Sequence, residues 1–484
     1  MGGIANVLIV QSISTSQPSG KLGNSLIFGQ NAFNTTLVSG DSLKMSSLQI
    51  DNMVSIGTLP FTIEYWIKFK NLTFYNQFVH ENGQVIFGGP SITGSLAVVH
   101  RFNSVYINNY LIGNNILTIP SAAIPSQSWQ LDTWYHVAIS RNASNQLTMH
   151  VNGYRSPAGA VVNGIDYFIS SNSIGTWRNL RGAGTTNNFI GYLFGYRINI
   201  GSNVYDPTQS VVQVPKTAVA VLPDTKLLMI SPNGNPYGNL TAPATVSIKT
   251  GIVGQSKDTP YSDEIILQGA QYNAISPFAS QRSGSIRFFG NITNFGYLLP
   301  SSDFALGTQD FTIEWFSYKT DNNSNSTIWW YGTTAAPIYG FSYVTSGINY
   351  YITFYHNGTS LILASLLKTT IDNQWAHWAL VRINGVMKLY RNGISLTPSG
   401  VSNPTNYSNS SETFYIAKRG QSALAEETFG GYFSNLRIIK GKGIYTDTFT
   451  TPTDNLQRVD IANPFGGANT LSVRSDQVKR LLVP

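Results

Sequence analysis

The carboxylates of this 484-residue sequence are the first residues to test for chemistry, because two of them together can hydrolyse a glycosidic bond. A retaining glycosidase needs two carboxyl groups about 5–5.5 Å apart. Glu64 in FTIEYWIKFK and Glu314 in FTIEWFSYKT each stand alone in their run. Asp263 and Glu264 are adjacent, so in a strand their side chains would point to opposite faces. We therefore expect no hydrolase and no enzyme.

Two histidines and two arginines recur at equivalent positions and could belong to a metal site. His136 and His377 each follow a tryptophan by two residues, and Arg197 and Arg437 lie in another recurring segment. A histidine–metal site needs further ligands that converge on the ion, and none is visible nearby in the sequence. The chain has no cysteine, which excludes thiolate zinc sites and disulfides. We expect hydrogen-bonded structural histidines in half-buried strands, and arginines that brace a neighbouring loop carboxylate or carbonyl.

Aromatic side chains are the other candidates, because a sugar ring can stack on an exposed aromatic face. The candidate contacts to a glycan or to a protein interface are Trp177 and Arg178 in GTWRNLRGAG, and Trp329, Trp330 and Tyr331 in TIWWYG. Alternation along a strand assigns about half of the aromatics in the second group to a core. Trp177, flanked by Gly175, Arg178 and Arg181, is the best loop candidate, with core or interface packing as its alternative.

The segments that carry these residues occur twice in the chain. The recurring pairs are GNSLIFGQ from Gly23 with GSIRFFGN from Gly284, FTIEYWIKFK from Phe61 with FTIEWFSYKT from Phe311, WYHVAISRNASNQLTMHVNG from Trp134 with WAHWALVRINGVMKLYRNG from Trp375, and FIGYLFGYRINIGSNVYD from Phe189 with FGGYFSNLRIIKGKGIYT from Phe429. The third pair begins 241 residues apart and the fourth lies 240 apart, a slip that a loop insertion in a duplicated domain would produce. The repeat therefore predicts two tandem copies of one unit of about 200 residues.

Each unit is predicted to be a β-sandwich. In FTIEYWIKFK, apolar residues alternate with others, which is the period of a strand, and Lys68 suggests that the far face meets water toward that end. Asn384 and Gly385 supply the positive φ of a two-residue hairpin turn. Gly191 and Gly431 inside strand-like runs indicate a bulge or a close backbone approach. We expect an all-β chain of two tandem antiparallel β-sandwiches.

The predicted boundaries follow from the repeat and from turn-forming residues. They are an N-terminal segment at 1–20, a first sandwich at 21–231, a linker at 232–262, a second sandwich at 263–455 and a C-terminal arm at 456–484. The linker contains SPNGNPYGNLTAPA, which is rich in Gly, Pro and Asn. The arm is too short and too sparsely apolar to be a domain, so we expect it and the N-terminal segment to be docking elements that order on assembly.

Composition excludes several partners. The net charge is +7, but the 30 Lys and Arg residues form no concentrated stripe, so nucleic-acid binding is not expected. No apolar stretch approaches the roughly 20 residues that span a bilayer, so no membrane segment is expected. The N-terminus lacks the basic start of a secretory signal, and the absence of cysteine fits folding in a reducing cytoplasm.

The second copy closely resembles the concanavalin A-like lectin/glucanase superfamily, in its laminin-G-like jelly-roll branch. The matching segments are SSDFALGTQDFTIEWF, WAHWALVRINGVMKLYRNG and GGYFSNLRIIKGKGIYTDTFTTP, and the first copy matches more loosely in the same order. The resemblance implies jelly-roll sandwiches. Its members include lectins, glycosidases, adhesion modules and virion proteins of phages and large DNA viruses, and the E-x-D-x-x-E pattern of the sandwich glucanases is absent here. Calcium is common in the superfamily, so a structural calcium is possible, and we expect no other cofactor. Asp41, Asp51 and Asp303 lie in predicted loops, but the sequence does not identify any of them as a calcium ligand.

Two functions remain open at this point. Our first expectation is a non-enzymatic structural protein of a virus particle: a minor capsid, decoration or fibre component, made in the host cytoplasm and assembled in multiple copies on the virion surface with other virion proteins. The uncharged surface that the composition implies favours it, since only 11% of residues are charged against about 25% in an ordinary domain. The alternative is a carbohydrate-binding lectin or adhesion module that recognises a cell-surface glycan.

Overall fold

The structure, a computed structural model, confirms the all-β prediction. It describes residues 25–28, 47–51, 55–70, 76–82, 96–101, 104–109, 114–119, 131–157, 159–167, 171–174, 189–215, 218–229, 245–250, 253–256, 258–279, 284–334, 337–456 and 478–483. Within these ranges the regular structure consists of β-strands and a few one-turn 3₁₀ helices. No helix among the described residues is long and apolar enough to cross a membrane.

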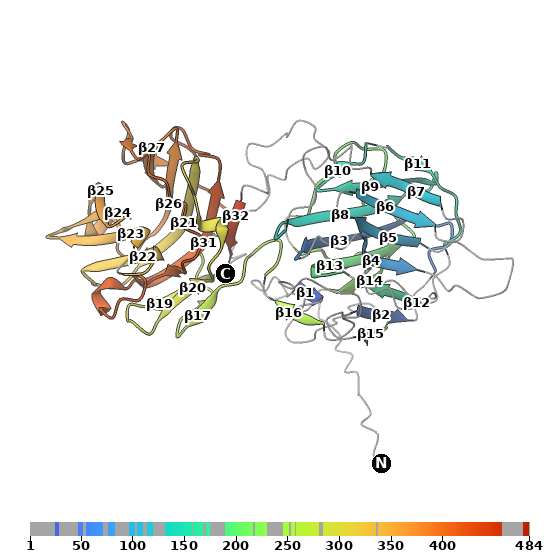
Figure 1. Ribbon diagram of the computed structural model, residues 1–484, viewed down its shortest axis with the longest axis horizontal. Coiled ribbons are helices and arrows are strands. Elements are labelled where there is room, and N and C mark those ends of the chain that lie inside the picture. The colour runs from blue at the N-terminus through green and yellow to red at the C-terminus, as the bar shows by residue number, and fades with distance from the viewer. Residues whose placement is uncertain are drawn as a thin grey trace, which may run out of the picture.

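The strands form four antiparallel sheets, two in each half of the chain (Figure 1). The first nine-stranded sheet has the order β10-β9-β8-β3-β13-β1-β16, with β11 beside β9 and β14 beside β13. Its strands are β1 (Ser25–Phe28), β3 (Phe61–Phe69), β8 (Trp134–Arg141), β9 (Gln146–Val151), β10 (Tyr154–Arg155), β11 (Val161–Val162), β13 (Gly191–Ile200), β14 (Thr225–Met229) and β16 (Gly254–Ser256). The facing seven-stranded sheet has the order β15-β2-β12-β4-β5-β6-β7. Its strands are β2 (Ser47–Asp51), β4 (Asn76–Asn82), β5 (Leu96–Arg101), β6 (Ser104–Asn109), β7 (Asn114–Ile119), β12 (Ser171–Ile174) and β15 (Thr245–Thr250).

The second half repeats this plan. Its seven-stranded sheet has the order β17-β20-β30-β22-β23-β24-β25, from strands β17 (Ile266–Gln268), β20 (Phe295–Leu298), β22 (Asn325–Gly332), β23 (Pro337–Ser346), β24 (Asn349–His356), β25 (Thr359–Leu367) and β30 (Phe414–Ile416). Its nine-stranded sheet has the order β18-β19-β31-β21-β26-β27-β28, with β29 beside β27 and β32 beside β31. Those strands are β18 (Gln271–Asn273), β19 (Ser285–Phe289), β21 (Phe311–Lys319), β26 (Trp375–Ile383), β27 (Val386–Arg391), β28 (Ile394–Ser395), β29 (Val401–Ser402), β31 (Gly430–Lys440) and β32 (Val478–Leu482).

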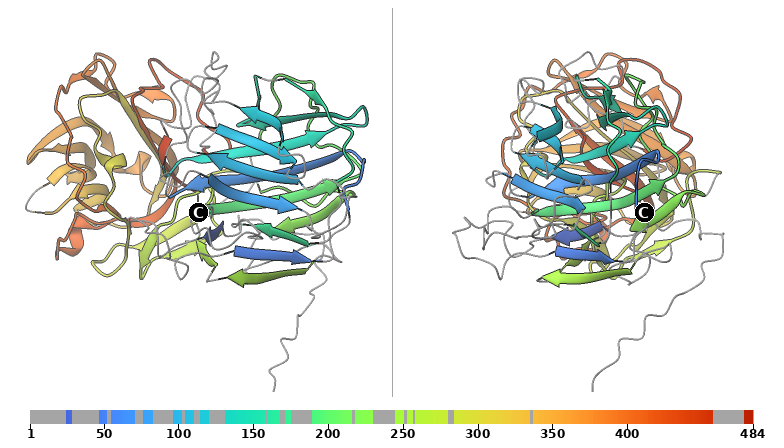
Figure 2. Two further views of the ribbon diagram at one scale, coloured as in Figure 1. Left: turned by 45° about the vertical axis from the view of Figure 1, so that its right-hand side comes forward. Right: turned by 90° about the vertical axis from the view of Figure 1, so that its right-hand side faces the viewer.

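Each pair of sheets encloses its own apolar core, so the chain contains two sandwiches. In the first core, Ile63 and Tyr65 of β3 face Ile50 of β2. In the second, Trp315 of β21 packs on Trp329 of β22, with ring centroids 5.5 Å apart. Figure 2 shows the strands of the first sandwich running side by side across its body. The predicted pair of antiparallel β-sandwiches is therefore confirmed.

The outer faces of the nine-stranded sheets are also buried, which the alternating pattern did not predict. Every residue of β3 is buried, including those on the face away from the core. Lys68 is only 5% exposed, because its ammonium pairs with Asp258 and lies over the rings of Trp134 and Tyr192. The expectation that this end of the strand meets water was wrong. In both halves, the segment that follows the last long strand folds back over this face, and we call these segments the first strap (201–215) and the second strap (441–456).

The predicted turn and close backbone approaches are confirmed. Asn384 and Gly385 have φ values of 51° and 74° at the β26–β27 hairpin, as a type I′ turn requires. A Cβ on Gly191 would lie 2.1 Å from the Lys68 carbonyl oxygen, and one on Gly431 would lie 2.1 Å from that of Tyr318. These glycines therefore let β13 and β31 approach their neighbours. The bulges lie farther along, between Phe194 and Arg197 in the first sandwich.

Segments outside the predicted sandwiches supply strands to them. β15 and β16 lie within the predicted linker at 232–262, yet they pair with β2 and β1 of the first sandwich. β32 lies within the predicted C-terminal arm, yet it pairs with β31. Leu481 of β32 stands opposite Arg437, just as Leu228 of β14 stands opposite Arg197, so β32 is the counterpart of β14. Part of the arm thus completes the second sandwich of its own chain.

Candidate functional site

A cluster of four polar side chains lies under the first strap, centred on Glu64. Arg197 donates from Nε to Glu64 Oε1 at 2.7 Å, and also from Nη2. His136 Nε2 donates to Glu64 Oε2 at 3.2 Å, and the Tyr205 hydroxyl donates to the same oxygen at 2.7 Å. Glu64 and His136 are 0% exposed. The strands β3, β8 and β13 carry three of the four, and the strap adds the tyrosine.

The second sandwich holds the same cluster, centred on Glu314. Arg437 donates to Glu314 Oε1 from Nε at 2.8 Å and from Nη2 at 2.7 Å. His377 Nε2 donates to Oε2 at 3.0 Å, and so does the hydroxyl of Tyr445 in the second strap. A buried carboxylate with three donors is satisfied rather than free to react. The predicted hydrogen bonding of both histidines is confirmed, but their strands are buried on both faces rather than half-buried. The carboxylate that each arginine braces lies on a strand and not on a loop.

The electrostatics keep both carboxylates ionised. Burial by itself would raise the pKa of Glu314, but Arg437 and His377 lower it to about 2. The pKa of Glu64 is lowered as well, with burial opposed by His136 and Arg197. A general acid of a glycosidase needs the opposite shift, toward neutral pH. These two glutamates therefore act as fixed anions in separate sandwiches, which supports a structural role.

A second duplicated device was missed by the sequence reasoning, although its residues stand in equivalent positions of the third repeat block. Arg141 and Arg382 are each 0% exposed, and their guanidinium groups donate to backbone carbonyl oxygens. Arg382 donates to the carbonyls of Gly307, Gln309 and Thr405 at 2.6 to 3.1 Å. Its guanidinium lies over the ring of Phe311, 4.7 Å from the centroid. These arginines fasten loops to the end of the sheet.

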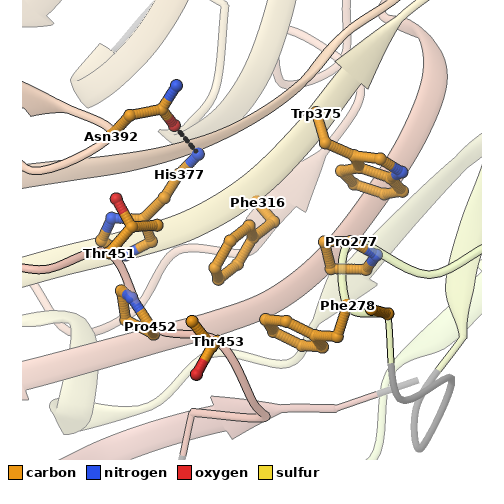
Figure 3. A pocket seen from close by; sticks show the side chains of 10 residues that line it. Pro277, Phe278, Phe316, Trp375, His377, Asn392, Thr451, Pro452 and Thr453 are labelled. Carbon is orange, nitrogen blue, oxygen red and sulfur yellow. Dashed lines mark hydrogen bonds between the residues drawn. The ribbon is translucent and has the colours of Figure 1, made fainter.

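A hollow of about 280 Å³ lies on the outer face of the second nine-stranded sheet, next to the Glu314 cluster. Its lining residues are Pro277, Phe278, Ala279, Phe316, Trp375, His377, Asn392, Thr451, Pro452 and Thr453 (Figure 3). Phe316 and Trp375 come from β21 and β26, while Thr451, Pro452 and Thr453 come from the second strap. Phe278 packs on Phe316 with ring centroids 5.0 Å apart. Trp375 is half-buried, and its ring lies against those of Tyr318 and Tyr432, with centroids 5.7 and 6.4 Å away.

One polar atom at this hollow has no partner. His377 is 1% exposed, and its Nδ1 makes no hydrogen bond within the described part of the chain. Its Nε2 must carry a proton, because the ionised carboxylate of Glu314 can only accept. In the neutral ring Nδ1 is then an acceptor, and a ligand with a hydroxyl group could satisfy it. Asn392 meanwhile fixes the strand, because its Oδ1 accepts from the His377 backbone N at 2.9 Å.

The equivalent place in the first sandwich is closed. Tyr261 covers Trp66, the counterpart of Phe316, with ring centroids 5.8 Å apart. The Tyr261 hydroxyl accepts from Trp66 Nε1 at 3.1 Å and donates to the Pro215 carbonyl at 3.2 Å. Trp134, the counterpart of Trp375, is only 2% exposed, and its Nε1 donates to Asp258 at 3.1 Å. The segment that joins the two sandwiches thus seals the first copy.

Three of the aromatic residues predicted as contacts do not line this hollow. Trp329, Trp330 and Tyr331 are all 0% exposed, which corrects their selection as surface contacts. Trp329 and Tyr331 point into the core, as alternation requires. Trp330 faces outward but is covered by Arg419, whose guanidinium lies 4.9 Å from its ring centroid, and by a neighbouring tyrosine. Trp177 and Arg178 lie outside the described residues, and their role stays a prediction.

No metal centre emerges from the residues that the structure describes, since no three or more His, Cys, Asp or Glu side chains gather there. Asp303 pairs with Arg480 at 3.1 Å, and its carboxylate also accepts from Ser301 at 2.9 Å. Asp41 lies outside the described residues, and Asp51 ends β2. The possible structural calcium therefore stays an unplaced prediction.

Comparison with known proteins gives a family match. The model of the concanavalin A-like lectin/glucanases superfamily matches residues 44–198 and 293–442, which is more than half of the chain. No curated protein matches it. Among solved structures, domains LG4-5 of the mouse laminin α1 chain are 10% identical with a TM-score of 0.32, and the match covers 93% of this chain and 99% of that one. A heptameric SAP-like pentraxin from Limulus polyphemus is 12% identical with a TM-score of 0.32, over 49% of this chain and 96% of that one. Domain 4 of an extracellular GH43 arabinanase from Geobacillus stearothermophilus, in complex with arabinotriose, is 15% identical with a TM-score of 0.29, over 39% and 87%.

Proposed function

Because this chain belongs to the concanavalin A-like lectin/glucanase superfamily, we propose that it is a non-catalytic carbohydrate-binding or adhesion module. The family and the two sandwiches support a binding module in general. The hollow beside Trp375 and His377 is the candidate ligand site, because an apolar concavity with one convergent polar group is the usual form of a small-molecule site.

One observation carries this proposal: a partly exposed tryptophan stands beside an unsatisfied polar atom. A pyranose offers an apolar face of C–H groups and a rim of hydroxyls. Trp375, which is half-buried, can receive the apolar face, while His377 Nδ1 can accept a hydroxyl proton.

The absence of catalysis is part of the proposal. Hydrolysis with retention requires two carboxyl groups on either side of one sugar bond. Glu64 and Glu314 lie in different sandwiches, and each is enclosed by three donors. No Asp or Glu is among the residues that line the hollow.

The test is to screen the intact chain on a glycan array and to incubate it with any glycan that binds. We expect retention of a subset of glycans and no release of reducing sugar. If no glycan is retained, the binding proposal fails. If reducing sugar appears, and disappears in a Glu314→Gln variant, the non-catalytic part fails.

A structural role in a virus particle is our second proposal. It rests on the low charged fraction of 11%, and neither the fold nor the comparisons add support to it. Under this proposal the chain is a minor capsid, decoration or fibre component on the virion surface, and other virion proteins are its partners. Mass spectrometry of purified particles would find the chain in fixed copy number, whereas its absence from particles would end this proposal.

A further inference from the structure

We infer that the hollow takes a single uncharged sugar ring, and that the tandem carries this site once, in the second sandwich. The inference rests on the proposed binding function and adds to it the ligand class, the contacts and the number of sites. It follows from comparing two copies of one geometry within the same chain.

The orientation of the His377 ring defines one contact. Its Nε2 is committed to Glu314 at 3.0 Å, and Arg437 holds that carboxylate from the other side. The ring therefore cannot turn to present Nε2 to a ligand without breaking a buried bond. Only Nδ1 remains, and a hydroxyl group suits it in either state of the ring, because a hydroxyl can both donate and accept.

The size and charge of the hollow define the ligand class. A volume of about 280 Å³ is at the lower end of the roughly 300–1,000 Å³ that small-molecule pockets have, so it suits one ring rather than a chain of them. No Lys or Arg lines it, so a sulfate or carboxylate on the sugar would lose water without gaining a counter-ion. Neutral hexoses or N-acetylhexosamines are therefore expected, at a chain end or as a branch.

The first sandwich shows which feature creates the site. His136 Nδ1 also lacks a partner there, so the unsatisfied nitrogen comes with the duplicated cluster and does not by itself indicate a ligand. The difference is access. Tyr261 packs over Trp66 and Trp134 is only 2% exposed, whereas Trp375 in the second sandwich is half-buried at the wall of the hollow. Phe278 packs on Phe316 as Tyr261 packs on Trp66, so the two copies differ at the tryptophan, and the site exists where that tryptophan remains partly exposed.

The closing experiment uses a matched pair of variants in the full-length chain. Glutamine can still donate to the glutamate from its Nε2, but it lacks the acceptor at the position of histidine Nδ1. We would compare His377→Gln with His136→Gln, and include Trp375→Ala and Trp375→Phe. Each variant is checked for a native far-ultraviolet circular dichroism spectrum and is then titrated with the neutral glycan that the array selects.

The expected result is one bound glycan per chain. His377→Gln should weaken binding about tenfold, as the loss of one hydrogen bond predicts, whereas His136→Gln should leave binding unchanged. Trp375→Ala should abolish detectable binding and Trp375→Phe should retain part of it. A second bound glycan whose binding His136→Gln weakens would refute the closure of the first copy, and unchanged binding by His377→Gln and Trp375→Ala would refute the site while leaving the lectin proposal intact. Binding of only sulfated or sialylated glycans would refute the ligand class, and no binding by the intact chain would refute the proposed function and this inference together.

Discussion

Replacing Glu314 by glutamine should destabilise the second sandwich by an amount that depends on pH. The pKa of Glu314 is about 2 in the folded chain against 4.5 as its usual value, because Arg437 and His377 outweigh the effect of burial. A difference of that size corresponds to roughly 3 kcal/mol of folding free energy when the carboxylate is ionised in both states. The variant also leaves the Arg437 guanidinium, whose side chain is 13% exposed, without a counter-ion.

The sign of the pH dependence follows from the lowered pKa. Between about pH 4.5 and pH 2, the unfolded chain binds a proton at Glu314 that the folded chain does not. The stabilisation is therefore complete above pH 4.5 and is lost as the pH falls toward 2. Glutamine does not titrate, so the difference between wild type and Glu314→Gln should shrink over this window by up to about 1.4 kcal/mol per pH unit.

Urea unfolding followed by tryptophan fluorescence at pH 7, 5 and 3 would measure this difference. Glu64→Gln is the matched control, because it removes the same charge from the first sandwich, where the pKa is also lowered. The two variants should shift different parts of the unfolding curve. If Glu314→Gln costs the same at pH 3 as at pH 7, or costs nothing at either, the ion-pair account of this cluster is wrong.

Three further changes test other parts of the structure. Arg382→Met removes the donors to the carbonyls of Gly307, Gln309 and Thr405, so we expect a loss of roughly 2–4 kcal/mol in urea unfolding, and an unchanged stability would contradict the anchoring role. Deleting 478–484 removes β32, whose Leu481 and Leu482 are 1% and 2% exposed. The second sandwich should then become sensitive to limited proteolysis while the first stays resistant. Equal resistance of both sandwiches would show that β32 is dispensable. Trp330→Ala should lower stability by about 3–5 kcal/mol, as expected for a buried indole, yet leave glycan binding unchanged in a titration. A selective loss of binding in that folded variant would instead restore Trp330 as a ligand contact.

Some residues of the site were visible in the sequence only as repeated positions. Tyr205 and Tyr445 recur in the fourth repeat block, and His136 and His377 in the third, yet the blocks do not say that these pairs meet at one carboxylate. The β32 strand is a similar case. VKRLLV from Val478 is the counterpart of TKLLMI from Thr225, but the match is too short to indicate a fifth repeat block by itself. Strand register identifies it, because Leu481 stands opposite Arg437 and Leu228 opposite Arg197.

By itself the sequence determined the strand and turn character of the repeated segments and the duplication of the unit. Alternation and turn residues are local signals, and the repeat spacing is inherited when a domain is duplicated. The period of two in the run from Phe61 implied a strand, and Asn384-Gly385 implied its type of hairpin. The tertiary structure alone decided what covers the outer faces. Lys68 became buried, Trp330 was covered by Arg419, and Tyr261 closed one copy while Trp375 stayed partly exposed in the other. Such exposure depends on segments that lie about 90 to 195 residues away along the chain, and the residues of a strand carry no record of what later packs on them.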